Sequence, residues 1–193
     1  MKILLASGSP RRAALLSEVG MDFRVVVTNA SEDFDKSLPA ELISERIAQR
    51  KALAALEYAD DDEYVIAADT SVVVDSKILG KPKDAADARR MLTLLSGRSH
   101  TVYTGVAVIH NGKTVTSHES TSVEFENLDD ELINSYISTN APFDKAGSYG
   151  IQGYGQALVK GIKGDYFNVM GLPLNLLFKI LKKDFNVSPL SWI

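Results

Sequence analysis

The chain has 193 residues, of which 45% are apolar and 24% are charged, which is the composition of an ordinary globular protein. Its net charge of −4 argues against a general nucleic-acid binder, and the absence of cysteine excludes disulfides, thiolate metal sites and a cysteine nucleophile. No apolar run approaches the ~18 residues of a membrane span, and the first apolar run is too short for a signal peptide. We therefore expect a single cytoplasmic domain over residues 1–193, with neither a nucleic acid nor a membrane as partner.

Hydrophobic periodicity, together with glycine and proline punctuation, predicts alternating strands and helices. In chain order these are strand 2–6, helix 11–19, strand 23–28, helix 39–58, strand 64–68 continued by 71–74, helix 84–95, strand 99–109, strand 114–125, helix 129–138, strand 157–162 and a helix from Gly171-Leu172-Pro173 to about 183. Asn111-Gly112 is a strong hairpin signal between two of the strands. The combination of βα units with a long hairpin indicates an α/β fold with a mixed sheet.

The first chemical signal is the segment Ser7-Gly8-Ser9-Pro10-Arg11-Arg12, where a strand ends and a helix begins. Backbone N–H groups at a helix N-terminus attract anions, and arginines at that end oppose the helix dipole unless an anion compensates them. A bound phosphate would do so. Two exposed arginines on a first helix would give the same pattern, so this segment alone leaves both interpretations open.

Three further charged side chains are candidates: two lie within apolar segments, and one lies in a polar loop. Asp69, followed by Thr70, stands between two apolar strand segments, so we expect it at a strand end or a bulge, bound to a metal or paired. Lys51 shares a helix side with Ile47 and Ala48, and such a lysine most often extends to water. Glu32 lies in a polar loop, where a solvated carboxylate is the ordinary interpretation.

Two loops complete the set of candidates. Lys81 lies in the rigid loop Gly80-Lys81-Pro82, a weak signal by itself. The glycine-punctuated segment 144–153 is too rich in aromatic and apolar residues to be disordered, and its Gln152 has the donor and acceptor groups needed to read a base edge. Together the candidates supply two carboxylates for Mg²⁺ or Mn²⁺, four cations for a polyphosphate and a polar loop for a base. No Walker A pattern is present.

These residues resemble the Maf family of nucleotide pyrophosphatases over nearly the whole chain. The matching motifs, in order, are Ala6-Ser7-Gly8-Ser9-Pro10-Arg11-Arg12, Ala67-Ala68-Asp69-Thr70, Gly80-Lys81-Pro82, Ser96-Gly97 with His100-Thr101-Val102-Tyr103-Thr104, the segment 144–153, and Gly171-Leu172-Pro173-Leu174. The segment Asn29-Ala30-Ser31 departs from the family, in which a glycine and an apolar residue are commoner before the carboxylate at position 32.

The resemblance implies an elongated mixed β-sheet flanked by helices, with two lobes around a cleft (Maf/ITPase-like), and a possible homodimer. It assigns the general base to Asp69, further catalytic positions to Lys51 and Lys81, and metal ligation to Glu32 and Asp69. Substrate contacts are assigned to five residues: Ser7, Arg11, Arg12, Thr70 and Gln152.

The implied reaction is hydrolysis of a nucleoside triphosphate between its α- and β-phosphates, with Mg²⁺ or Mn²⁺ as cofactor. The sequences Asp144-Lys145-Ala146-Gly147 and Ile151-Gln152-Gly153 resemble the branch that hydrolyses dTTP and UTP. Modified pyrimidine triphosphates are further substrates to expect, and their hydrolysis would prevent misincorporation into nucleic acids. The alternatives are a 7-methyl-GTP pyrophosphatase and a nucleotide-sensing regulator of septum formation with little turnover. A pure sensor needs no general base, which favours the enzyme.

Overall fold

The computed structural model describes residues 1–35, 37–188 and 190–191. Its strands are β1 Lys2–Ala6, β2 Phe23–Val26, β3 Glu63–Val74, β4 Lys77–Leu79, β5 Ser99–His110, β6 Lys113–Phe125 and β7 Val159–Lys163. Its helices are α1 Pro10–Glu18, α2 Ala40–Ala55, α3 Ala85–Leu95, α4 Asp130–Ser138, α5 Tyr166–Met170 and α6 Leu174–Phe185, with 3₁₀ helices η1 Leu56–Tyr58, η2 Ala146–Ser148 and η3 Gly153–Ala157.

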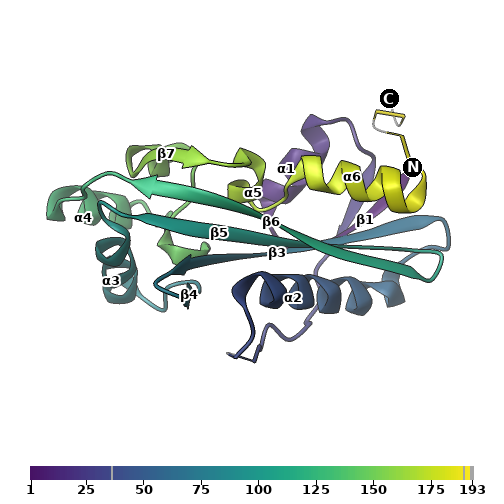
Figure 1. Cartoon of the computed structure of the whole chain (residues 1–193), viewed down its shortest axis with the longest axis horizontal. Coiled ribbons are helices and arrows are strands. Elements are labelled where there is room, and N and C mark those ends of the chain that lie inside the picture. The colour runs from purple at the N-terminus through teal and green to yellow at the C-terminus, as the bar shows by residue number, and fades with distance from the viewer. Residues whose placement is uncertain (36, 189, 192–193) are drawn as a thin grey trace. The chain divides into compact units, whose positions relative to one another are not determined.

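The described strands form one seven-stranded sheet in the order β2-β1-β3-β5-β6-β7, with β4 added alongside β3 (Figure 1). β1 runs parallel to both β2 and β3, whereas the pairs β3–β4 and β6–β7 are antiparallel. The predicted mixed α/β sheet flanked by helices is therefore confirmed.

The chain divides into two compact units, each with its own core. Unit 1 comprises residues 1–69, 104–119 and 171–193, and unit 2 comprises residues 70–103 and 120–170. Strands β3, β5 and β6 contribute residues to both units, so the backbone of the sheet is continuous through the division.

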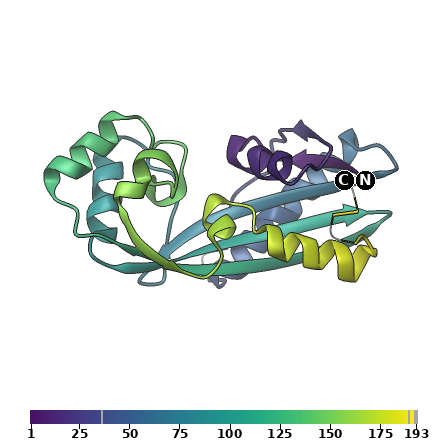
Figure 2. The ribbon, with the colours of Figure 1, turned by 90° about the horizontal axis from the view of Figure 1, so that it is seen from above.

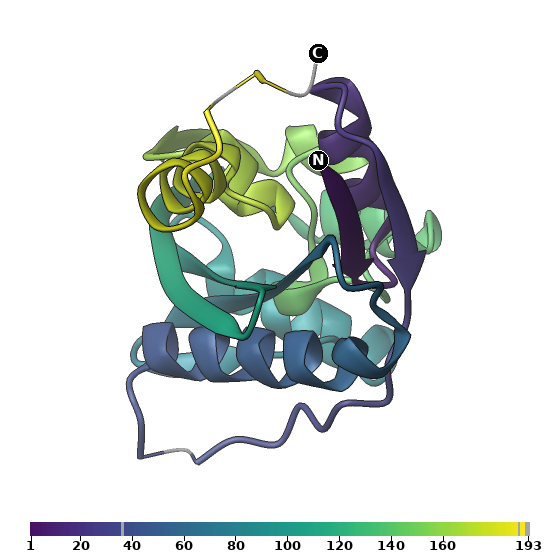
Figure 3. The same cartoon turned by 90° about the vertical axis from the view of Figure 1, so that its right-hand side faces the viewer.

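In unit 1 the sheet is covered on both faces, by α2 on one side and by α1 and α6 on the other (Figure 3). α2 packs its small side chains Ala48, Ala52 and Ala55 against strand residues that include Val65 and Ala67. Small side chains allow a helix to approach a sheet closely, and each apolar Å² buried contributes about 25 cal/mol. This contact fixes the height of α2 above β3.

In unit 2, α3 and α4 lie beside the segment that contains η2 and η3 (Figure 2). Their shared core is rich in large side chains, among them Leu92 from α3, Phe125 from β6, Ile133 from α4 and Tyr149 from the loop after η2. The α3 and α4 N-termini are capped as expected for their sequences, because Asp84 and Asp129 each accept the backbone N–H of the third helical residue.

One local expectation was wrong, and two short elements were not predicted. β3 does not end at Asp69, because it is continuous from Glu63 to Val74. β4 was not expected, because the turn before it uses Asp75 and Ser76 at φ 49° and 61° rather than the Asn-Gly or Asp-Gly pairs that signal a tight hairpin. α5 has only five residues, too few to establish a helical period.

Within the described ranges, no helix is both long enough and apolar enough to cross a membrane.

Candidate active site

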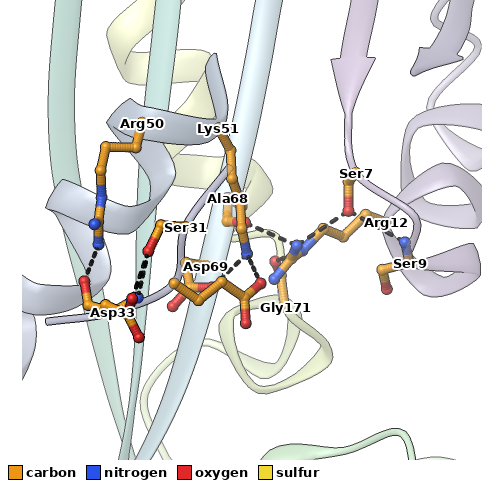
Figure 4. A network of polar contacts seen from close by, with 11 residues as sticks. Ser7, Ser9, Arg12, Ser31, Asp33, Arg50, Lys51, Ala68, Asp69 and Gly171 are labelled. Atoms are coloured by element: carbon orange, nitrogen blue, oxygen red, sulfur yellow. Dashed lines mark hydrogen bonds and ion pairs between the residues drawn. The ribbon is translucent and has the colours of Figure 1, made fainter. Parts of the chain in front are cut away.

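Unit 1 brings two of the predicted carboxylates onto one predicted lysine. Lys51 Nζ lies 2.7 Å from Asp69 Oδ1 and 2.6 Å from Glu32 Oε1 (Figure 4). The Lys51 and Asp69 side chains are 16% and 13% exposed, whereas Glu32 is 59% exposed. The lysine therefore does not extend into bulk water, as an isolated lysine on a helix usually does, but lies between two carboxylates.

The alternation of β3 explains why this contact forms. Successive strand residues point to opposite faces, so Val65, Ala67 and Asp69 share the face that α2 covers. In α2, Lys51 lies between Ala48 and Ala52, which both pack in this core. The lysine therefore reaches the Asp69 carboxylate from beside the apolar contact.

The pairing of β3 with β1 and β4 is interrupted around Asp69, although β3 itself is continuous. β1 pairs with β3 only as far as Leu5 opposite Ile66, and β4 pairs with it only from Val72 onward. Residues 67–71 therefore have neither strand as a partner. β1 ends because Ser7-Gly8-Ser9-Pro10 turns the chain into α1, so the turn that starts α1 also ends the pairing of β1 with β3 before Asp69.

Arg12 holds several segments of unit 1 together. Its Nε donates to the Gly171 carbonyl at 2.6 Å, and its Nη1 donates to the Ala68 carbonyl at 2.8 Å and to Ser7 Oγ at 3.1 Å (Figure 4). Burial lowers the pKa of Arg12, and the nearby Asp69 carboxylate opposes that shift. The Ala68 carbonyl directly precedes Asp69, so Arg12 fixes the backbone of the candidate base.

The start of α1 lacks the side chains that normally satisfy a helix N-terminus. Ser9 at the N-cap makes no side-chain cap bond, Pro10 is at the first helical position, and the first turn contains no acidic residue. Ser7 Oγ accepts instead from the Ser9 backbone N–H at 3.2 Å. Arg11, partly buried, lies in the same first turn. This arrangement suits an anion, as the sequence pattern predicts.

The remaining predicted residues belong to unit 2. Thr70 follows Asp69 in β3 and is partly buried, Lys81 is exposed in the loop after β4, and Gln152 is exposed at the N-cap of η3. The loops that carry Lys81 and Gln152 are joined, because the Gly147 N–H donates to the Gly80 carbonyl at 3.0 Å.

Sequence reasoning did not identify the backbone acceptors of Arg12 or the contacts that shape the loop around Glu32. In that loop Ser31 Oγ donates to Asp33 Oδ2 at 3.0 Å, and Arg50 Nη2 donates to the Asp33 carbonyl at 2.5 Å. Because every residue has a backbone carbonyl, the sequence does not show which carbonyls accept hydrogen bonds. The motif Gly171-Leu172-Pro173 was the available signal that this turn has a role near the site.

Comparison with known proteins gives a consistent result. A family model described as "Maf-like protein" matches residues 2–184. A relative from Thermoanaerobacter sp. (strain X514), named dTTP/UTP pyrophosphatase, is 46% identical over 189 residues, 97% of this chain and 98% of the relative. A Bacillus cytotoxicus relative of the same name is 50% identical over 183 residues, 94% and 95% of the two chains. Among solved structures, the Staphylococcus aureus Ham1 protein superposes with a TM-score of 0.47 and 17% identity. The superposition covers 65% of this chain and 72% of the Ham1 chain.

Proposed function

The chain belongs to the Maf family, and from this premise we propose that it hydrolyses dTTP and UTP to the nucleoside monophosphate and pyrophosphate. Relatives that match it over nearly the full length of both chains carry the name dTTP/UTP pyrophosphatase. The structural observation that carries the proposal is the convergence of Asp69 and Glu32 on Lys51 beside the backbone that Arg12 fixes. These residues supply a base, carboxylate ligands and positive charge in one unit.

In the proposed reaction, water attacks the α-phosphorus, and the bond from that phosphorus to the α–β bridging oxygen breaks. Asp69 accepts the proton of the attacking water, and pyrophosphate leaves. Lys51, Arg11 and Lys81 stabilise negative charge on the polyphosphate, and so does Arg12 where its protein contacts permit. An arriving polyphosphate offers Lys51 oxygen acceptors that replace its carboxylate partners, which would leave Asp69 able to take the proton.

The carboxylates fit a divalent metal that is bound together with substrate. Glu32 Oε1 and Asp69 Oδ1 both approach one cationic nitrogen, so a positive ion is already favoured between them. Over the ranges that the structure describes, no group of three or more histidine, cysteine or acidic residues could hold a metal unaided. Mg²⁺ commonly uses one or two carboxylates plus substrate phosphates, and it would supply charge stabilisation at the phosphate oxygens.

Removal of divalent metal should therefore abolish turnover. We expect activity to disappear in excess EDTA and to return with Mg²⁺ or Mn²⁺, whereas Ca²⁺ and Zn²⁺ should restore it poorly, because Ca²⁺ is larger and Zn²⁺ prefers nitrogen and sulfur ligands. Hydrolysis rates measured after chelation and readdition test this. Full activity in excess EDTA would rule out the metal.

The products distinguish this reaction from other phosphate hydrolyses and from sensing without turnover. Phosphorus NMR of a UTP digest should show UMP and pyrophosphate in equal amounts. Orthophosphate with UDP would contradict attack at the α-phosphorus. Binding of nucleotide with no product would instead support the regulator of septum formation.

We propose that Gln152 and Thr70 read the base. A uracil or thymine edge needs an acceptor for N3–H and donors for its carbonyls; an amide side chain has both groups, and a hydroxyl can serve as either. Cytosine lacks N3–H, so its edge leaves matched groups unpaired. dTTP and UTP should accordingly be hydrolysed much faster than CTP and the purine triphosphates.

Replacing Gln152 with Glu removes the amide donors while keeping the size of the side chain. We expect the preference for UTP over CTP to weaken by a factor corresponding to ~1–3 kcal/mol. Specificity constants for UTP, CTP and 7-methyl-GTP in wild type and Gln152→Glu measure this. A wild type that prefers 7-methyl-GTP would place the chain in the other branch of the family.

We also propose that the two compact units act as one functional domain, because three strands contribute residues to both. A cytoplasmic location, a homodimer, and the absence of nucleic-acid and membrane partners stay predictions.

A further inference from the structure

The loop that carries Gln152 is fixed to unit 2 by buried groups that the proposed reaction does not use. Its Tyr149 and Ile151 side chains are buried, whereas Gln152 between Ile151 and Gly153 is exposed. The Gly150 backbone N–H donates to Tyr136 Oη at 3.2 Å, and the Gly147 N–H donates to the Gly80 carbonyl at 3.0 Å. The loop is thus attached at points on both sides of Tyr149.

The tyrosine itself is attached to β5 by a buried side-chain hydrogen bond. His100 Nε2 and Tyr149 Oη are 2.6 Å apart, and the two residues are 3% and 5% exposed. Phe125 packs edge-on against both rings, with centroid distances of 5.0 Å to His100 and 4.6 Å to Tyr149. The hydrogen bond therefore lies inside an aromatic cluster from which water is excluded.

The protonation of this pair makes the hydrogen bond difficult to replace. Burial lowers the pKa of His100 to about 4 and raises the pKa of Tyr149, so at neutral pH the imidazole is uncharged and the phenol is protonated. His100 Nδ1 has no hydrogen-bond partner among the described residues. If Tyr149 donates to Nε2, one buried polar group is unsatisfied, whereas the reverse direction leaves two, so we take tyrosine as the donor.

The backbone of the loop is held in a conformation that it would not adopt alone. Gly147 and Ser148 have consecutive positive φ angles of 67° and 65°, and Ser148 is fully buried. A non-glycine residue in this region is unfavourable and persists where surrounding contacts impose it. At Gly155, a Cβ would lie 1.7 Å from the Gly150 carbonyl oxygen, so the two ends of the Gln152 segment touch.

We propose that the His100–Tyr149 hydrogen bond positions the loop Asp144–Gly155 and thereby sets base selectivity through Gln152. His100 and Tyr149 are then specificity-determining positioning residues, and they act through the loop. This inference deepens the proposed function and rests on it for the role of Gln152. It gives a role to a histidine to which the sequence assigned none.

The first test is Tyr149→Phe, which keeps the ring and removes the hydroxyl. We expect the ratio of kcat/KM for UTP to that for CTP to fall about fivefold, the factor that corresponds to ~1 kcal/mol of lost hydrogen bonding. Amide hydrogen exchange should accelerate in 144–157 without nucleotide and stay unchanged in 63–68. Tyr154→Phe is the matched control, because Tyr154 is in the same segment but is 69% exposed, and it should behave as wild type.

The double variant His100→Leu/Tyr149→Phe separates positioning from stability. Each single change leaves one buried polar partner unpaired, whereas the double change removes both, so thermal stability should recover relative to His100→Leu. Selectivity should stay low in the double variant if the hydrogen bond positions the loop. Recovery of selectivity together with stability would overturn the proposal, and so would unchanged selectivity in all three variants.

The loop-positioning proposal can be tested even if the proposed substrate preference is wrong. If wild type prefers another nucleotide, the selectivity ratio is taken between that nucleotide and CTP. If wild type turns over none, the ratio of dissociation constants for UTP and CTP replaces it. Unchanged hydrogen exchange in 144–157 together with an unchanged ratio contradicts the loop assignment whichever reaction the protein catalyses.

Discussion

Asp69→Asn should lower kcat for UTP by at least ~100-fold, the usual scale for loss of a general base. The amide is nearly isosteric with the carboxylate but cannot accept the proton of the attacking water. It also replaces one of the two carboxylate oxygens that approach Lys51, while Glu32 remains 2.6 Å from the same ammonium. Because Lys51 keeps one charged partner, the variant should fold, and steady-state kinetics with circular dichroism and thermal melting would show both effects.

Asp184→Asn is the matched control for this variant. This substitution also removes the carboxylate partner of a lysine in unit 1, because Lys113 Nζ lies 3.4 Å from Asp184 Oδ1. Asp184 lies outside the proposed site. Its turnover should equal that of wild type. Wild-type kinetics in Asp69→Asn would remove Asp69 from the role of base, and an unfolded Asp69→Asn protein would show instead that the Lys51 ion pair is structural.

The sequence was informative wherever side-chain period determines the structure. The apolar segments 64–68 and 71–74 predicted strand on both sides of Asp69. Asn111-Gly112 predicted the hairpin between β5 and β6, and both residues have positive φ. It was less informative at Asp69 itself. A carboxylate within an apolar strand suggested a break in the strand. In the structure the strand continues, and the Asp69 carboxylate pairs with Lys51 from α2, a long-range contact that no local sequence pattern contains.

In the candidate site, too, the sequence identified the side chains but not their long-range contacts. The family resemblance assigned Arg12, Glu32, Lys51 and Asp69 to one site, and unit 1 brings these four residues together. The interpretation of Arg12 as a phosphate ligand could not include its bonds to the Ala68 and Gly171 carbonyls, because their positions depend on tertiary folding. Likewise, the sequence assigned no role to His100, since its hydrogen-bond partner Tyr149 is 49 residues away.

Gly105 in β5 is a position where a single added methyl group should disturb the Lys51–Asp69 contact, because it faces the backbone of α2. A Cβ there would lie 2.3 Å from the Ser44 carbonyl carbon and 2.4 Å from the Glu45 nitrogen, both in the backbone of α2. Backbone cannot rotate away as a side chain can, so the helix must shift. Lys51 lies seven residues, about two turns, beyond Ser44 and therefore near the same side of the helix.

Gly105→Ala should consequently reduce stability and activity together. Overpacking of this kind costs about 2–3 kcal/mol, which for a chain of this size lowers the melting temperature by roughly 5–10 °C. A shift of ~1 Å in α2 would also displace Lys51 from Asp69, and misplacement on that scale lowers turnover by up to ~100-fold. Kinetics must be measured well below the melting temperature, so that unfolding does not contribute to the loss.

Gly161→Ala provides the comparison that isolates the close approach. Gly161 is also a strand glycine, in β7, but an added Cβ there would meet nothing within 4 Å. It should melt within a few degrees of wild type and keep full turnover. If Gly105→Ala matched Gly161→Ala in melting temperature, α2 would not touch β5 in solution. If it melted earlier but kept wild-type turnover, the height of α2 would matter for stability alone, and the placement of Lys51 would not limit the reaction.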